Sequence, residues 1–212
     1  ATGDRPDVDR RAPDVLIGLH IENNTATVSL DVSGGPQHKR GYRSKSVEAP
    51  MQETVAAAII RMSGWDGTMP LYDPMCGSGT LLAEALMACC RIPAQVFRTR
   101  FGFMRLPDFN PQLWEDIQVS AKQDIQPLLP GLISGSDISE QAVNAAKTNL
   151  MGLHYGMHVP VDQKDFRQIP GIADSLVVTN PPYGIRMGKD KDLTSFYQDL
   201  GIFLRERCTR SS

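Results

Sequence analysis

The feature that most constrains the fold of this chain is the alternation of short apolar runs with helical segments after residue 70. The predicted strands are residues 70–73, 132–137, 159–162 and 175–179, and the predicted helices are residues 79–91, 139–152 and 193–207, with one more beginning at residues 110–111. Asn110 and Ser139 are favoured N-caps, and Gly152 is a favoured helix terminator. This alternation predicts an α/β fold in which helices cover both faces of a parallel sheet. Ligands of such sheets bind at the carboxyl ends of the strands.

Two β-rich runs precede this pattern, at residues 15–21 and 26–32. The four residues between them, Glu-Asn-Asn-Thr, favour a turn, so the two runs are predicted to pair as a hairpin. A basic segment that contains glycines follows at 33–46. Pro50 is then predicted to be the first residue of a helix that ends before Gly64.

Composition excludes several classes of protein. The chain is 41% hydrophobic and 22% charged, which is ordinary for a soluble globular protein, and no apolar run approaches the roughly 18 residues of a membrane helix. The polar first residues do not resemble a secretory signal. The four cysteines lack metal-site spacing, so we expect no metal and reduced thiols in a cytoplasmic protein. The net charge of −2 gives no global sign of nucleic-acid binding.

A glycine-containing turn, Asp73-Pro-Met-Cys-Gly-Ser-Gly-Thr80, connects a predicted strand to a predicted helix. Gly77 and Gly79 would let the backbone turn sharply and approach a ligand. The free amides of the helix N-terminus suit the carboxylate of an amino-acid-like ligand, and Asp73 would fix the turn or meet an ammonium group. The turn lacks the patterns of dinucleotide and phosphate loops. The alternative is a glycine-rich turn without function.

Two further carboxylates follow strands in the same order along the chain. Asp137 ends the second strand and can accept hydrogen bonds from both hydroxyls of a ribose. Asp165 follows the third strand and can accept one from an adenine amino group, while Phe166 can pack on the ring. Each acid alone could be a helix cap or a surface residue. Together they indicate a ligand that carries adenosine.

The tetrapeptide Asn180-Pro-Pro-Tyr183 follows the fourth strand. The exocyclic amine of a base is a poor nucleophile, because its lone pair is delocalised into the ring. The Asn180 side-chain oxygen and the Pro181 carbonyl could hold the two amine hydrogens and aim the lone pair at a methyl group. Tyr183 could stack on an extruded base. The alternative is a proline-rich turn that only ends a strand.

Two basic segments are candidates for RNA contact. Residues 91–105 hold four arginines and three phenylalanines and no acid, and residues 38–45 are basic around Tyr42. Such mixtures suit phosphate contact and base stacking. The residues proposed for RNA binding are Arg98, Arg100, Lys39, Arg40 and Arg43. Equally, the phenylalanines could be core and the arginines a solvated face.

These motifs resemble the class I, Rossmann-like methyltransferases that methylate amino groups. The nearest likeness is to the THUMP-containing RNA guanine-N2 methyltransferases, above all the bacterial 23S ribosomal RNA enzymes. The stretches that carry the resemblance are 38–43, 49–54, 73–82 and 178–184. The resemblance implies S-adenosylmethionine as cofactor and RNA as substrate. It places Asp73, Gly77 and Gly79 at the methionine end of the cofactor, Asp137 at the ribose, Asp165 at the adenine, and Asn180, Pro181 and Tyr183 around the target base.

The family sheet has seven strands, whereas only four core strands are predicted here. We therefore expect residues 49–212 to be a methyltransferase domain that is truncated before its fifth strand, and poorly stable alone. Residues 1–48 are interpreted as a linker and hairpin, the tail of an RNA-binding region on the THUMP side. Three alternatives stay open: a transfer RNA guanine-N2 methyltransferase, a DNA adenine-N6 methylase with the same tetrapeptide, and a non-catalytic RNA-binding remnant.

Overall fold

The computed structural model describes residues 8–9, 13–47, 50–182 and 193–212. Its centre is a sheet of four parallel strands in the order β5-β4-β3-β7. The strands are β3 (Leu71–Asp73), β4 (Ile133–Asp137), β5 (Val161–Gln163) and β7 (Leu176–Val177). The prediction of four parallel core strands is confirmed, although β5 and β7 are shorter and begin later than predicted.

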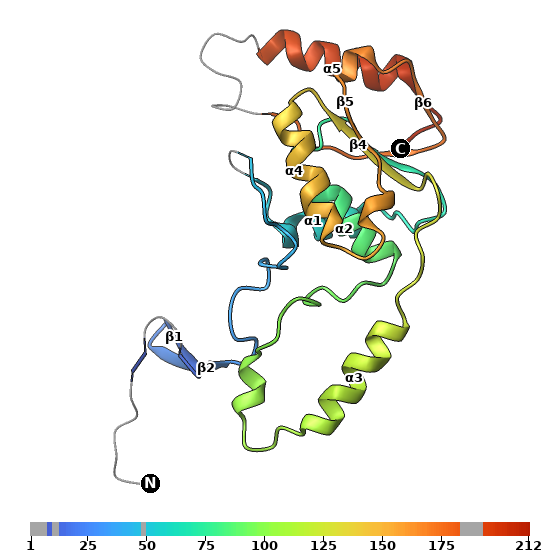
Figure 1. Ribbon diagram of the computed structural model, residues 1–212. Coiled ribbons are helices and arrows are strands. Elements are labelled where there is room, and N and C mark those ends of the chain that lie inside the picture. The colour runs from blue at the N-terminus through green and yellow to red at the C-terminus, as the bar shows by residue number, and fades with distance from the viewer. Residues whose placement is uncertain (1–7, 10–12, 48–49, 183–192) are drawn as a thin grey trace.

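Helices cover both faces of this sheet, as the alternation predicted (Figure 1). On one face, α1 (Glu53–Met62), α2 (Thr80–Cys89) and α4 (Glu140–Met151) enclose the larger core. Leu71, Leu82, Leu86 and Ile133 have no exposed surface there. On the other face lies α5 (Leu193–Arg207), whose Phe196 and Phe203 belong to a smaller core.

Four short elements complete the sheet region. The 3-10 helices η2 (Gly156–His158) and η3 (Phe166–Gln168) flank β5, and β6 (Ile172–Ala173) pairs in parallel with β8 (Cys208–Thr209). After β8, Ser212 donates to the carbonyl of Ser175 and accepts from the amide of Val177. The chain that follows α5 therefore returns to the free edge of β7.

Two parts of the chain stand off from these layers (Figure 1). The predicted hairpin is present as β1 (Leu16–Glu22) and β2 (Thr25–Asp31), with every residue of β1 exposed. The second part, residues 91–125, is here called the arm. It carries η1 (Gly102–Arg105) and α3 (Pro111–Gln123).

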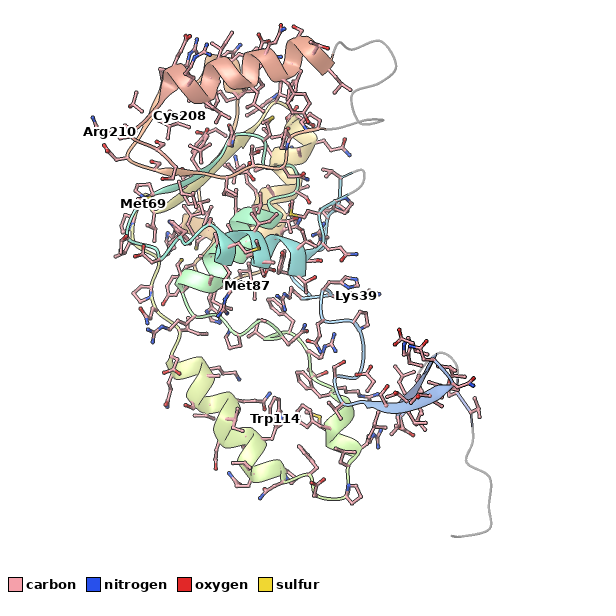
Figure 2. The ribbon with its side chains drawn as sticks, turned by 180° about the vertical axis from the view of Figure 1, so that it is seen from behind. Lys39, Met69, Met87, Trp114, Cys208 and Arg210 are labelled. Carbon is pink, nitrogen blue, oxygen red and sulfur yellow. The ribbon has the colours of Figure 1, made fainter. Side chains whose placement is uncertain are left out.

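Aromatic rings hold the arm together. Phe101 and Phe103 stack with centroids 5.1 Å apart, and the Trp114 ring meets both edge-on. Figure 2 shows Trp114 on α3, on the side of that helix that faces η1. Phe101 and Phe103 are thus packing residues, in line with one of the two interpretations of the basic and aromatic segment, whereas Phe97 is exposed. The two ends of the arm lie close together, because the Gln126 amide donates to the Cys90 carbonyl at 2.8 Å.

The helix boundaries follow local chemistry with one exception. Asn110 and Ser139 cap α3 and α4 through their side chains, as predicted. Pro50 does not open α1, which begins at Glu53 after the N-cap Gln52. The Arg43 guanidinium donates to the Met51 carbonyl at 2.7 Å, which ties down the residue before the N-cap and delays the helix. No helix among the described residues is long and apolar enough to span a membrane.

Gly135 allows β3 and β4 to lie close under α2, and its replacement should destabilise the fold. A Cβ atom at this position would lie 2.9 Å from the Asp73 carbonyl oxygen and 2.8 Å from a methyl of Leu82. We expect Gly135→Ala to lower the free energy of unfolding by about 1–3 kcal/mol, measured by urea denaturation. The control is Gly201→Ala in α5, where a Cβ meets nothing within 4 Å. That change should stabilise the helix by roughly 0.5–1 kcal/mol, and equal losses in both variants would contradict the packing argument.

Candidate active site

Most of the residues singled out in the sequence line one cavity of about 870 Å³ at the carboxyl ends of the strands. They are Asp73, Gly77, Asp137, Asp165, Phe166 and Asn180. Gly79 and Pro181 adjoin lining residues in the chain, and Tyr183 lies outside the described residues. Parallel topology explains the gathering, because loops that follow parallel strands leave the sheet at the same edge.

The glycine-containing turn is fixed to the neighbouring strand. The Cys76 amide donates to the Ser136 carbonyl of β4 at 2.9 Å. Gly77 and Gly79 both have positive φ, +55° and +79°, where residues with a Cβ are strained. Gly79 is the N-cap of α2 and has no side chain to satisfy the first amides of that helix. Those amides are therefore available to an anionic ligand.

Gly79 also brings the turn against α4. A Cβ atom here would lie 3.0 Å from the Cβ and 3.2 Å from the Cα of Ala146. The position thus needs glycine for its backbone conformation and for its contact. The sequence indicated the first requirement, whereas the second depends on the packing of α4.

Asp137 joins the second strand to the glycine turn. Its carboxylate accepts the Gly77 amide at 2.8 Å through one oxygen and the Ser139 amide at 2.9 Å through the other. A carboxylate has about four acceptor positions, so capacity for a ligand's hydroxyls remains. Asp137 can therefore hold the turn and a ribose together.

Asp73 is buried beneath the turn with 1% of its surface exposed. It accepts the Met75 amide at 3.1 Å, as expected of an aspartate that fixes a turn. Burial, together with the nearby Asp137 carboxylate, raises the pKa of Asp73 to about 7. The site therefore holds a carboxyl group that changes its charge near neutral pH.

Asp165 and Phe166 form the far wall of the cavity. The Asp165 carboxylate accepts the Arg167 amide at 2.9 Å and pairs with its guanidinium at 3.2 Å. The Phe166 ring is 3% exposed, packs edge-on against Phe196 and Phe203, and lies 4.7 Å from the Arg167 guanidinium. Little of the ring is left for a ligand, so Phe166 shapes the wall more than it offers a stacking face.

The tetrapeptide begins on the same cavity. Asn180 and Pro182 line it, and both are half-buried. The Pro182 carbonyl accepts a hydrogen bond from the Tyr197 hydroxyl of α5 at 3.2 Å. Helix α5 therefore holds the backbone at Pro182, within the described part of the tetrapeptide.

One wall of the cavity was missed in the sequence. It consists of Ser46, Val47, Pro50 and Met51, which we call the lip. Pro50 and Met51 belong to the stretch 49–54 that carries the family resemblance, but no ligand contact is predicted for them, and Pro50 is predicted only as a helix start. The lip comes from a segment before the first strand of the sheet, so strand-end reasoning could not find it.

Three of the five arginines and lysines proposed for RNA binding are committed to the fold. Arg40 and Arg43, with side chains 11% and 14% exposed, pair with Glu84 and Glu53 at 3.4 and 3.0 Å. Buried carboxylates need such partners, because an unpaired buried charge is costly. The Arg98 guanidinium donates to the carbonyls of residues 33, 35 and 36.

Lys39 and Arg100 remain candidates for RNA contact, because both are exposed. Figure 2 shows Lys39 on the segment between the hairpin and the sheet layers. We therefore correct the sequence interpretation for Arg40, Arg43 and Arg98. Among the described residues, no group of three or more histidines, cysteines and acids could hold a metal ion.

Comparison with known proteins identifies the family. Residues 40–212 match the RMKL-like methyltransferase domain. This chain belongs to that family. It is 38% identical over 204 residues to a candidate RNA methyltransferase of Synechocystis sp., covering 96% of this chain and 53% of that protein. It is 35% identical over 204 residues to ribosomal RNA large subunit methyltransferase K/L of Vibrio campbellii, covering 93% and 29%.

Solved structures give the same answer for the fold. A candidate methyltransferase complexed with SAH superposes with a TM-score of 0.81 at 30% identity, over 92% of this chain and 51% of the other. A predicted N6-adenine-specific DNA methylase from Listeria monocytogenes gives 0.79 at 30% identity, over 90% and 50%. The expected Rossmann-like class I methyltransferase fold is confirmed. The chain spans about half the length of the Synechocystis protein and less of the Vibrio enzyme.

The raised pKa of Asp73 predicts a pH-dependent cost in stability. The unfolded chain releases this proton near its usual pKa of 3.8, whereas the folded chain keeps it up to about 7. The contribution of Asp73 to stability is therefore full below pH 4, falls as pH rises, and is lost above 7. Asp73→Asn lacks this titration, so its melting temperature relative to the wild type should rise between pH 4 and pH 7 and then level off. Parallel melting profiles of the two proteins over this range would disprove the assignment.

Proposed function

We propose that this domain transfers a methyl group from S-adenosylmethionine to the exocyclic N2 amine of guanosine in RNA, with 23S ribosomal RNA as the substrate. The observation that carries this proposal is that the glycine turn, three ordered carboxylates and Asn180 line one cavity. A ligand with both an amino-acid end and an adenosine end would contact the glycine turn and all three carboxylates. Asn180 and Pro182 of the tetrapeptide line the same cavity.

S-adenosylmethionine is the cofactor, and we propose the following role for each residue that would hold it. The open amides at the start of α2 suit its carboxylate, and Asp73 lies beneath them, where it can meet the ammonium group. Asp137 keeps acceptor capacity for the ribose hydroxyls, and Asp165 lies on the wall proposed for the adenine. When bound, the cofactor supplies an activated methyl group. A relative with 30% identity was crystallised with SAH, the product form of such a ligand.

Asn180 and Pro181 would prepare the nucleophile. The Asn180 side-chain oxygen and the Pro181 carbonyl accept the two amine hydrogens, which restores the lone pair to the nitrogen and directs it into the cavity. The hydrogen bond from Tyr197 to the Pro182 carbonyl keeps these acceptors in position. A strong base is unnecessary before transfer, because the nitrogen becomes acidic once it is methylated. Tyr183 is proposed to stack on the base.

The choice of RNA rests on the relatives. The Synechocystis and Vibrio proteins are named as enzymes of RNA and of large-subunit ribosomal RNA. Lys39 and Arg100 are proposed to contact RNA phosphates, and residues 1–48 to belong with the RNA-binding side. Such a substrate would place the protein in the cytoplasm. The alternative with its own support is a DNA adenine-N6 methylase, since the Listeria neighbour carries that description.

Isotope transfer separates these functions. The chain is incubated with S-adenosylmethionine labelled in the methyl group and, in parallel, with bacterial RNA and unmethylated DNA. We expect label in RNA, recovered as N2-methylguanosine after digestion, and none in DNA. Label in DNA as N6-methyladenine would refute the proposal in favour of the DNA enzyme. Cofactor binding without any transfer would favour an RNA-binding remnant.

Asn180→Ala tests the catalytic assignment. Loss of one of the two acceptors should lower kcat by about 100-fold or more. The dissociation constant for SAH, measured by calorimetry, should change by less than about twofold, because Asn180 would hold the base and not the cofactor. Asn144→Ala provides the same change at an exposed position on α4 and should leave both values unaltered. Retained activity in Asn180→Ala would show that the amine is activated elsewhere.

A further inference from the structure

Asn149 is a buried polar residue of α4 that contacts Ser78 of the glycine turn, with 1% of its surface exposed. Its side-chain oxygen accepts the amides of Ser44 and Lys45, both at 2.9 Å. Its side-chain nitrogen donates to the carbonyls of Lys45 at 2.8 Å and Ser78 at 3.0 Å. An amide side chain has two acceptor positions and two donors, so every one is used.

These four bonds join three separate parts of the chain. Ser78 lies in the glycine turn and itself lines the cavity. Lys45 immediately precedes Ser46, the first residue of the lip. Asn149 thus connects the lip and the turn, the two walls between which the cofactor would lie, through a single side chain.

Arg43 connects the other end of the lip, at Met51, to the first residue of α2, the helix that follows the glycine turn. One guanidinium nitrogen donates to the Met51 carbonyl at 2.7 Å and to the Thr80 hydroxyl at 3.0 Å. A second nitrogen pairs with Glu53 at 3.0 Å. The lip is therefore held at both ends, by Asn149 near Ser46 and by Arg43 at Met51. Asn149 bonds to Ser78 and Arg43 to Thr80, so both attachments reach the start of α2.

We propose that Asn149 is a positioning residue that fixes the lip against the glycine turn and so sets the affinity for the cofactor. This inference rests on the proposed function, because it assumes that S-adenosylmethionine binds between these walls. A buried asparagine that served only to satisfy nearby backbone groups would contribute to stability alone. If Asn149 is a positioning residue, ligand binding and its four hydrogen bonds depend on each other. If it contributes to stability alone, they do not.

Amide hydrogen exchange in the wild-type chain tests this dependence without any substitution. We call the four hydrogen bonds of the Asn149 side chain the clamp. Because coupling is reciprocal, if the clamp raises the affinity for a ligand, binding of that ligand must also stabilise the clamp. Saturating SAH should therefore slow exchange of the Ser44 and Lys45 amides by about tenfold or more, as followed by NMR. The Leu113 amide is a matched control, since it also donates to an asparagine oxygen, that of Asn110, at 3.1 Å in α3. Its exchange should not change.

A pair of neighbouring variants separates positioning from stability. Asn149→Ala removes the clamp, whereas Leu150→Ala removes packing from the larger core next to it. Both should lower the melting temperature. Only Asn149→Ala should also raise the dissociation constant for SAH, by about tenfold or more, measured by calorimetry below the melting temperature of both variants.

The outcomes distinguish this inference from the function on which it rests. If the wild-type chain does not bind SAH, both the proposed function and the clamp are wrong. If SAH binds but exchange of the Ser44 and Lys45 amides is unchanged, the clamp is overturned and the proposed function stands. Equal dissociation constants for Asn149→Ala and Leu150→Ala would overturn it as well. Should Asn149→Ala fail to fold, the exchange measurement on the wild type decides alone.

Discussion

The parallel pairing of β3 with both β4 and β7 is the constraint on which the rest of the structure depends. It directs the loops after these strands to one edge, and so brings Asp73, Asp137 and Asn180 to one cavity from distant points of the sequence. The pairing is made possible by close packing under α2, where Gly135 leaves room for Leu82. A change in this packing would therefore move the walls of the site as well as weaken the core.

The basic residues before the sheet show how burial redirects charge. Arg40 and Arg43 belong to a segment whose composition suggested RNA binding, yet they neutralise Glu84 and Glu53 inside the protein. Burial raises the pKa of Glu84, and the Arg40 guanidinium opposes that rise. The segment thus stabilises the helices α1 and α2 and presents the lip to the cavity. Positive charge counts toward nucleic-acid binding only where it is left exposed.

The sequence could predict what local chemistry determines. N-caps such as Asn110 and Ser139 act within one helical turn, so α3 and α4 were located closely, and acids at strand ends could be assigned because the sheet is parallel. The partners of Arg40 and the role of Asn149 could not be predicted. Each depends on contacts between residues more than forty positions apart, which exist only after the helices have packed. A polar residue on the buried side of α4 was the one available sign.

The arm has a consequence for how this domain can vary. Helix α3 has no buried residue, and the excursion that contains it leaves and rejoins the structure at one hydrogen bond between Cys90 and Gln126. Insertions or deletions inside such a closed excursion need not disturb the strands on either side. The middle of the arm, around α3, is thus a part of the fold whose length can change without moving the strands that line the cavity, whereas Ile92 near its start packs in the larger core. The Phe103 amide of the arm donates to the Val32 carbonyl just after the hairpin, so a change of length near η1 would shift the hairpin as well.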